Sequence, residues 1–332
     1  MRKITNERDG TAFECDDNDT ILRAALRAGV GMAYSCNVGS CGNCRFELID
    51  GDVEHIRDDP PAWSERDARK NKWLGCQARP LGDCTVKFRP DAQYVSESAP
   101  KRMQGTLTKI APITRDITEF TFELPDAPDF QPGQYALLSV PGVEGGRAYS
   151  MCNLAGGATW SFQIRRVPGG AATEVLFEKL APGATVDIDG PYGTAHLRPG
   201  IERDIILIAG GSGLSPMVSI ARGARAANML PERKVHFYYG CRTGDDAISA
   251  AYLDSELGFV DNFVTAVSDP AHFEGWSGAT GFLHDVCLSD FGETLKNYEI
   301  YFAGPPIMAA SIQKMAYENG VPADQLHFDE FY

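Results

Sequence analysis

The stretch CNVGSCGNC, residues 36–44, places three cysteines and two glycines within nine residues, and 31 further residues separate its last cysteine from Cys76. The spacing C-x4-C-x2-C followed by a distant cysteine is typical of plant-type [2Fe–2S] proteins. The two glycines let backbone N–H groups approach the sulfur atoms. The pattern therefore predicts four ligands of a [2Fe–2S] cluster: Cys36, Cys41, Cys44 and Cys76.

Other interpretations of these cysteines fit less well. A structural zinc site usually pairs two C-x2-C or H-x3–5-H units, and this chain has one such unit. A Rieske centre needs two histidines, and none lies in the loop or beside Cys76. Cys84 is an alternative fourth ligand. The five cysteines outside the motif are expected to pack as small apolar residues: Cys15, Cys84, Cys152, Cys241 and Cys287.

A second glycine-rich stretch, IAGGSGLSPM, follows an apolar segment and opens a helical pattern. The free N–H groups of a helix start attract the phosphates of a dinucleotide. The stretch departs from the Rossmann pattern, because Pro216 stands where the third glycine would follow Gly211 and Gly213. Ser215 as N-cap and Pro216 at the first helical position explain it as a helix start. A dinucleotide loop and a simple helix cap both remain open.

The elements that would position these motifs fall into three segments. Residues 1–90 predict one helix in TILRAALRAG and a small mixed sheet, and a polar, proline-flanked linker covers 89–101. Residues 104–200 contain short strands separated by turns, which favour a barrel. From residue 201, the apolar strands DIILIAG, VHFYYG and YEIYFAG alternate with helical stretches, which is typical of a parallel sheet covered by helices.

Composition excludes several functional classes. The chain has 332 residues and a net charge of −14, of which −10 falls in residues 201–332, so nucleic acid is not expected as a partner. No apolar run approaches the length of a membrane helix, and no signal peptide is recognisable. Clustered cysteines fit a reducing compartment. We expect a cytoplasmic, monomeric protein that has no membrane partner.

The whole chain resembles the three-domain NADH-dependent reductase components of bacterial multicomponent oxygenases. The stretches RKNKWLGCQARPL, GGRAYSMCN and HFDEFY are most similar to reductases of soluble di-iron monooxygenases of the toluene 4-monooxygenase type. The resemblance implies a β-grasp ferredoxin domain (1–92), an antiparallel β-barrel that binds FAD (100–200) and an α/β parallel-sheet domain that binds NADH (201–332).

The resemblance also implies a flavin site around an R-x-Y-S motif. Arg147 would pair with the pyrophosphate, Tyr149 would present its ring to the isoalloxazine, and Ser150 would bond near N5. An ordinary barrel strand is the alternative explanation of the motif. The stretch PGGAAT would lie along the pyrophosphate, and an aromatic residue at the chain end would stack on the other flavin face. These two groups are Gly169, Gly170 and Thr173, and Phe331 and Tyr332.

On the nicotinamide side, the resemblance places Arg242 against the dinucleotide and AGPPIM near the nicotinamide ring, through Gly304, Pro305 and Met308. The family usually has cysteine immediately before G-P-P, whereas this chain has Ala303, which puts the rate of hydride transfer in question. Acidic residues three and four positions after Arg242, in a domain of net charge −10, disfavour a 2′-phosphate, so NADH is expected rather than NADPH. These residues are Asp245 and Asp246.

The three sites form a relay. A hydride carries two electrons, a [2Fe–2S] cluster accepts one, and a flavin handles both. We expect electrons to pass from NADH through FAD and the cluster to a Rieske-type ferredoxin or to the hydroxylase of a di-iron hydrocarbon monooxygenase, which would dock around residues 38–43. A reductase of an aromatic-ring dioxygenase or of a deoxysugar pathway is an alternative, as is a non-enzymatic redox sensor. The dispersed histidines predict no oxygen-activating site in this chain.

Overall fold

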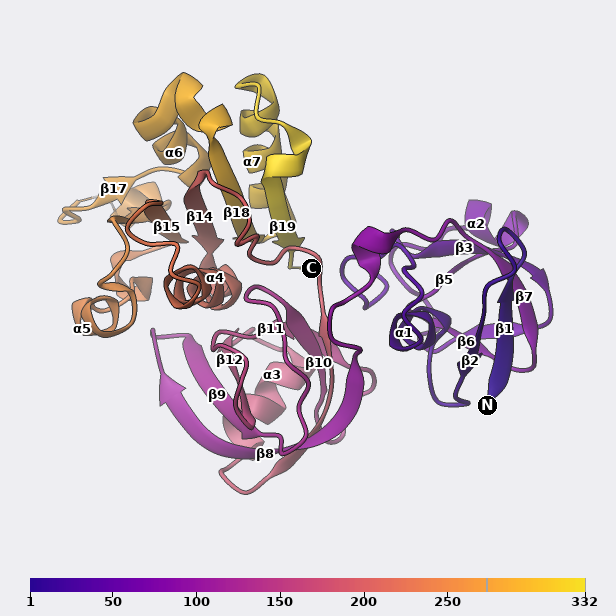
Figure 1. Ribbon diagram of the computed structural model, residues 1–332. Coiled ribbons are helices and arrows are strands. Elements are labelled where there is room, and N and C mark those ends of the chain that lie inside the picture. Colours follow the sequence, from indigo (N-terminus) through magenta and orange to yellow (C-terminus); the bar gives the residue numbers. More distant parts are fainter. Residues whose placement is uncertain (273, 332) are drawn as a thin grey trace.

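The computed structural model describes residues 1–272 and 274–331, and shows three units, each built on its own sheet (Figure 1). The N-terminal unit lies beside the barrel, and the parallel-sheet unit lies above the barrel in this view. The described part of the chain ends where the three units meet. Within that part, no helix combines the length and apolar character needed to cross a membrane.

The N-terminal unit contains the predicted small mixed sheet and the predicted helix, and also a short second helix, Glu65–Arg69, that the sequence patterns did not predict. The strand order is β2-β1-β7-β3-β5, with β1 and β7 parallel, and a separate pair β4-β6 lies beside it. Helix α1 ends just before Gly29, whose φ of 73° turns the chain toward the cysteine loop. The elements are β1 Arg2–Asn6, β2 Ala12–Cys15, α1 Ile21–Arg27, β3 Arg45–Asp50, β4 Val53–His55, α2 Glu65–Arg69, β5 Lys72–Leu74, β6 Ala78–Pro80 and β7 Cys84–Lys87.

The middle unit is an antiparallel six-stranded sheet in the order β11-β10-β13-β8-β9-β12. A bridge between Met151 and Phe162 joins the two ends of this order, so the sheet is nearly closed, and the predicted barrel is confirmed. Its elements are β8 Lys101–Pro112, β9 Ile117–Glu123, β10 Tyr135–Ser139, β11 Arg147–Ser150, β12 Thr159–Arg165, α3 Ala171–Glu174, a π-helical turn Val175–Lys179, and β13 Thr185–Tyr192.

The C-terminal unit is a parallel sheet in the order β17-β16-β15-β14-β18-β19, with helices packed against it. The sequence patterns predicted the three central strands, but not the outer strands. The elements are β14 Asp204–Gly210, α4 Leu214–Ala226, β15 Val235–Cys241, α5 Ala250–Tyr252, a π-helical turn Leu253–Leu257, β16 Asn262–Val267, β17 Ala279–Thr280, α6 Leu283–Phe291, β18 Tyr298–Gly304, α7 Pro306–Glu318 and β19 Leu326–Glu330.

The predicted helix start at Ser215 is wrong. Helix α4 begins at Leu214 with Gly213 as its N-cap, so Pro216 lies inside the first turn. The Ser215 hydroxyl instead bonds to the barrel, where it donates to the carbonyl of Ser150 at 2.6 Å. The first turn of α4 is therefore fixed by the neighbouring unit rather than by its own cap.

The segment between the N-terminal unit and the barrel is docked on the N-terminal unit. A 3₁₀ turn, Ala92–Tyr94, lies in the segment predicted as a linker between domains. The rings of Tyr94 and Tyr34 are 6.1 Å apart. A Cβ atom on Gly31 would lie 2.0 Å from the carbonyl oxygen of Asp91, so only glycine allows this approach.

The hydrophobic core of the N-terminal unit continues into the barrel. Three barrel residues, Tyr135, Leu137 and Tyr192, belong to the same buried cluster as the side chains of α1 and the N-terminal sheet. The two units therefore share a packed apolar boundary, and apolar packing limits the relative motion that is otherwise expected between domains.

Candidate functional site

The cysteine loop turns backbone N–H groups toward sulfur. The Sγ atom of Cys36 accepts hydrogen bonds from the backbone N–H of Ser40 at 3.4 Å and of Cys41 at 3.3 Å. The loop reaches this shape because Gly39 and Gly42 have φ values of 85° and 78°, which disfavour other residues. N–H donors of this kind stabilise thiolates and tune an iron–sulfur cluster.

The four predicted ligands lie in two pairs. Cys36 and Cys41 share a hydrogen bond, which lowers the pKa of Cys36 to about 6 and raises the pKa of Cys41. A hydrogen bond with Cys44, together with burial, raises the pKa of Cys76. No three His, Cys, Asp or Glu side chains within residues 1–272 and 274–331 gather as a site for one metal ion. Two thiol pairs fit a cluster of two irons with four thiolate ligands.

The thiol of Cys84, the alternative fourth ligand, forms hydrogen bonds with backbone carbonyl groups. It donates to the carbonyl oxygens of Gly82 at 3.4 Å and Asp52 at 3.5 Å, at the start of β7. All nine cysteines are free thiols, and each of the five outside the motif is buried.

A cavity of about 490 Å³ lies where the three units meet. Its wall contains Cys36 of the cysteine loop, Tyr149 and Ser150 of the R-x-Y-S motif, and Phe331 from the chain end. The further lining residues include Ser35, Val38, Tyr135, Arg147, Gln163, Arg165, Gly170, Thr173, Gly210, Pro305 and Asp329. The cavity thus joins the cysteine loop to the predicted flavin motif.

The R-x-Y-S motif forms β11, which is an outer strand in the strand order of the barrel sheet. Tyr149 lines the cavity, and burial raises the pKa of its hydroxyl to about 12, so this hydroxyl is neutral. Arg147 is exposed at the rim, where its Nη1 atom donates to the carbonyls of Glu144 and Gly145, both at 3.1 Å. The guanidinium is therefore held on the cavity edge, where it could pair with a phosphate.

The PGGAAT stretch forms the turn before α3. Gly169 has a φ of 71° and lies outside the cavity lining, whereas Gly170 is the N-cap of α3 and lines the cavity. The hydroxyl of Thr173 donates to the carbonyl of Val167 at 3.1 Å and accepts its N–H at 3.3 Å. Thr173 therefore closes the turn that shapes the cavity wall.

A second cavity, of about 620 Å³, opens at the carboxyl ends of the parallel strands. It shares three lining residues with the first cavity: Arg165, Gly210 and Pro305. Crevices at this edge of an open parallel sheet are where such sheets bind their ligands. The two cavities adjoin, so ligands in them would meet around Gly210 and Pro305.

Some of the residues predicted to bind the nicotinamide dinucleotide line the second cavity, and others lie behind its wall. Gly211, Arg242, Pro305 and Met308 line the second cavity. Pro216, Gly213 and Gly304 line neither cavity. A Cβ atom on Gly213 would lie 1.9 Å from the carbonyl oxygen of Ala303, so this glycine lets α4 approach β18. A Cβ atom on Gly304 would lie 2.5 Å from Cε of Met308.

Ala303 is fully buried in β18, where it pairs with Ala209, and it lines neither cavity. Asp246 lines the second cavity and forms an ion pair with Arg115 of the barrel at 2.6 Å. Phe331 lines the first cavity, but Tyr332 lies outside the residues that the structure describes.

Several lining residues carried no recognisable signal in the sequence. Arg165 borders both cavities and pairs with Asp116 at 2.6 Å. Asp329 also lines the first cavity. Burial raises the pKa of its carboxyl group to about 7, so this group gains or loses its proton near neutral pH. Tyr135 lines the same cavity and donates to the carbonyl of Ser35, one residue before Cys36, at 2.5 Å.

Comparisons with known protein families agree with this arrangement. Residues 4–81 match the 2Fe–2S iron–sulfur cluster binding domain, residues 104–197 the oxidoreductase FAD-binding domain, and residues 207–314 the oxidoreductase NAD-binding domain. The three predicted cofactors, a [2Fe–2S] cluster, FAD and NADH, are therefore supported. The chain is an oxidoreductase that transfers electrons between them.

Two relatives cover nearly the whole chain. The ferredoxin–NAD(P)(+) reductase CarAd of Metapseudomonas resinovorans is 37% identical over 99% of both chains. The ferredoxin–NAD(+) reductase component of the alkene monooxygenase system of Xanthobacter autotrophicus is 35% identical over 97% of this chain and 98% of the relative.

A solved structure of the ferredoxin reductase in carbazole 1,9a-dioxygenase superposes with a TM-score of 0.90 at 35% identity, covering 100% of this chain and 98% of the other. A cytochrome P450 reductase from Amycolatopsis superposes with a TM-score of 0.84 at 32% identity, covering 100% and 99%. The chain belongs to the family of ferredoxin–NAD(P)+ reductase components of multicomponent oxygenases.

Proposed function

We propose that the chain delivers electrons from NADH to a Rieske-type ferredoxin, or directly to a hydroxylase, in a di-iron hydrocarbon monooxygenase system. The observation that carries the relay is the shared cavity wall, in which Cys36 faces the same space as Tyr149 and Phe331. The adjoining cavity offers a place for the dinucleotide. The predicted domain limits, 1–92, 100–200 and 201–332, and the monomeric, cytoplasmic state belong to this proposal.

In the relay, bound flavin would convert a two-electron hydride into single electrons. We assign Arg147 and the turn at Gly170 to its pyrophosphate, with Gly169 and Thr173 shaping that turn. The ring of Tyr149 and the chain end at Phe331 and Tyr332 would enclose the isoalloxazine, and Ser150 would bond near N5.

The second cavity would hold NADH through the lining residues Gly211, Arg242, Pro305 and Met308, while Gly213, Pro216 and Gly304 set the backbone around it. We assign the cluster to Cys36, Cys41, Cys44 and Cys76. Their chemistry fits the cluster, because thiolates supported by backbone N–H donors are its usual ligands.

The outer side of the cysteine loop is where we place the acceptor. Cys41 is partly exposed, whereas the other three predicted ligands are buried. Val38 lines the inner cavity, so the contact surface narrows to Ser40, Cys41 and Asn43. Electrons would enter on the Cys36 side and leave on the Cys41 side.

A second acceptor class is favoured by the comparisons. The CarAd relative and the carbazole 1,9a-dioxygenase reductase structure both cover nearly all of the chain. The reductase of an aromatic-ring dioxygenase is therefore the second candidate, with the same internal relay and a different acceptor. Reduction rates for a monooxygenase ferredoxin, a di-iron hydroxylase and a dioxygenase ferredoxin, measured side by side with NADH, separate the two. A higher kcat/KM with the dioxygenase ferredoxin would overturn the monooxygenase assignment.

The docking surface is tested by Asn43→Lys, which adds a charge at an exposed position of the cysteine loop. We expect a changed KM for the protein acceptor and unchanged reduction of a small dye. Asn297→Lys is the matched control, because Asn297 is also exposed and lies before the amino end of β18, away from both cavities. Equal effects on protein acceptor and dye would refute the placement.

A further inference from the structure

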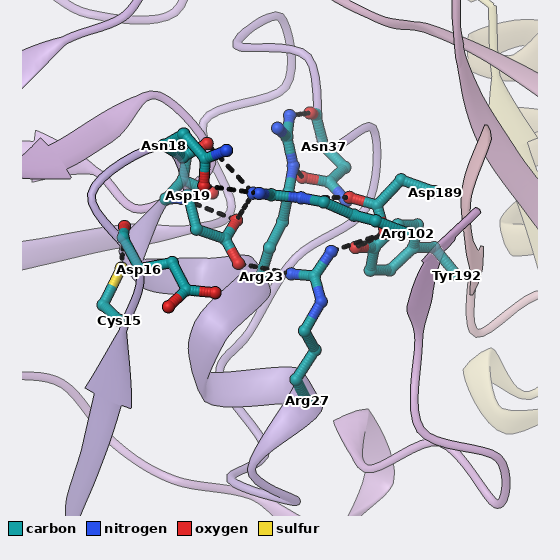
Figure 2. A network of polar contacts seen from close by, with 11 residues as sticks. Cys15, Asp16, Asn18, Asp19, Arg23, Arg27, Asn37, Arg102, Asp189 and Tyr192 are labelled. Atoms are coloured by element: carbon teal, nitrogen blue, oxygen red, sulfur yellow. Dashed lines mark hydrogen bonds and ion pairs between the residues drawn. The ribbon is translucent and has the colours of Figure 1, made fainter. Parts of the chain in front are cut away.

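A ring of two arginines and two aspartates joins the N-terminal unit to the barrel (Figure 2). Arg27, in the last turn of α1, contacts Asp19 of its own unit at 2.6 Å and Asp189 of β13 at 2.5 Å. Arg102 of β8 contacts Asp19 across the boundary at 2.6 Å. Each unit thus contributes one arginine and one aspartate, and each arginine reaches an aspartate of the other unit.

The ring is well shielded from water. The exposed fractions of the side chains are 4% for Asp19, 13% for Asp189, 23% for Arg27 and 35% for Arg102. Buried charges are tolerated only when they are paired and bonded, and the formal charges here balance. The hydroxyl of Tyr192 also donates to Asp189 at 2.9 Å. Separation of the two units would break the Arg27–Asp189 and Arg102–Asp19 pairs, so the ring opposes movement between them.

The same helix connects the ring to the cysteine loop. Arg23 lies one turn before Arg27 on α1, and donates to the side-chain and backbone oxygens of Asn37, both at 3.2 Å. Asn37 follows Cys36 directly, is 1% exposed and has a φ of 55°. Figure 2 shows both arginines extending from one helix, one toward Asn37 and the other toward Asp189. Helix α1 is therefore a rigid link between the barrel and Cys36.

Two further hydrogen bonds cross the boundary on the other side of the loop. Tyr135 donates to the carbonyl of Ser35, and the N–H of Gly193 donates to the hydroxyl of Tyr34 at 2.9 Å. The neighbours of Cys36 on both sides are therefore fixed by hydrogen bonds: Ser35 by Tyr135, and Asn37 by Arg23. One support leads to β10, whose Tyr135 lines the flavin cavity, and the other leads to β13, which pairs with β10.

We propose that Arg23, Arg27 and Asp189 are positioning residues, which fix Cys36 in the wall of the flavin cavity so that the flavin reduces the cluster in the docked arrangement. Each transfer takes one electron from the reduced flavin and adds one electron to the cluster, with no bond made or broken. The N-terminal unit stays on the barrel throughout turnover, and the acceptor comes to the cluster. This inference depends on the internal relay and not on the identity of the acceptor.

The test is Asp189→Asn, which keeps the shape of the side chain and removes its charge. In anaerobic single-turnover experiments with NADH and the holoenzyme, we expect flavin reduction to stay within about twofold and cluster reduction to slow on the order of tenfold or more, because small displacements cost large factors in rate. Limited proteolysis supplies a readout independent of activity. Cleavage between residues 89 and 100 should become faster as the N-terminal unit loosens.

The matched control is Asp187→Asn, on the same strand two residues away, where the aspartate is exposed and has no ion pair among the described residues. We expect it to behave as the wild type in both measurements. If Asp189→Asn gives no folded protein, Arg102→Gln removes the more exposed member of the ring. The proposal is overturned if Asp189→Asn or its substitute matches the control, or if proteolysis accelerates while cluster reduction keeps its rate.

Discussion

The barrel is held by its two neighbours in different ways. On the N-terminal side, a ring of charged side chains lies beside a shared apolar core. On the C-terminal side, the ion pair of Arg115 with Asp246 also crosses the boundary, but α4 bonds to the backbone of the barrel. Ser215 donates to the carbonyl of Ser150 at 2.6 Å, Ser219 to that of Asn153 at 3.0 Å and Arg222 to that of Cys152 at 2.8 Å.

The difference matches what each boundary must do. Hydride transfer needs reacting atoms about 3–3.5 Å apart, so the flavin motif and the dinucleotide loop must keep a tight register. Bonds from α4 to the backbone of residues 150–153 supply that register directly. An electron can cross a gap without such contact, so the cluster side needs a fixed distance rather than bonded backbone, and the shared apolar core and the charged ring supply it.

The largest effect on the reduction of a protein acceptor should come from removing the iron–sulfur cluster. We expect Cys76→Ser to prevent formation of a normal cluster and to reduce protein-acceptor reduction to background, because a thiolate ligand is lost. Flavin bleaching by NADH should continue, since the C-terminal boundary is untouched. Stopped-flow absorption and low-temperature EPR measure the flavin and the cluster separately. Cys84→Ser is the control and should keep the cluster. If flavin reduction failed together with the cluster signal, the two boundaries would not be independent.

The next largest effect should come from the C-terminal boundary. A Cβ atom at residue 213 would lie 1.9 Å from the carbonyl oxygen of Ala303, so Gly213→Ala must displace α4 or β18. We expect a loss of about 1–3 kcal/mol in the free energy of unfolding. Because α4 carries the bonds to residues 150–153, flavin reduction by NADH should slow by more than about tenfold.

Gly200→Ala is the control for this change, because a Cβ atom on Gly200 would meet no other atom within 4 Å and the residue lies outside both cavities. Stopped-flow flavin reduction and thermal unfolding should leave this variant close to the wild type. A Gly213→Ala protein with normal flavin reduction would show that α4 does not set the register for hydride transfer.

The sequence predicts what depends on short spacing, and misses what depends on contact between units. Three of the cluster cysteines lie within nine residues, and the backbone donors come from the same loop, so local spacing is sufficient. The ring could not be foreseen, because Arg27 and Asp189 lie 162 positions apart in the sequence and both are residue types common on protein surfaces. The sequence suggests a helix cap at Ser215, because nothing local indicates that its partner, Ser150, belongs to another unit.

The chain end shows the same limit. The resemblance placed an aromatic residue near the flavin, but the strand that brings it there, β19, has no strong pattern and lies at the sheet edge. Its pairing with β18 carries Asp329 and Phe331 into the first cavity. Asp329 lines this cavity together with Tyr135, which belongs to the apolar core shared with the N-terminal unit, so it lies at the junction of the three units.

Asp329 gives a pH-dependent measure of that junction. Burial raises its pKa from 3.8 to about 7, so the fold favours the protonated form. Its contribution to stability is therefore fully present below about pH 4 and is lost as the pH rises toward 7. We expect Asp329→Asn to remove this loss, so that the thermal unfolding midpoint of the variant gains on the wild type between pH 5 and 8. A constant difference across this range would show that Asp329 is ionised throughout.

The smallest effect should be that of salt on the rate of electron transfer from flavin to cluster. A rate that hardly changes with salt would show that the charges at the N-terminal boundary are shielded. Interactions between exposed charges that lie farther apart than the Debye length, about 10 Å at 0.1 M salt, are largely screened, whereas shielded pairs keep most of their strength. Asp19 and Asp189, at 4% and 13% exposed, belong to the second kind. Flavin-to-cluster transfer should therefore change by less than about twofold between 50 and 500 mM salt, while reduction of a protein acceptor that docks through surface charges should fall. A steep salt dependence of the internal step, measured by stopped-flow absorption, would place the controlling charges at the surface and make the N-terminal boundary a loose one.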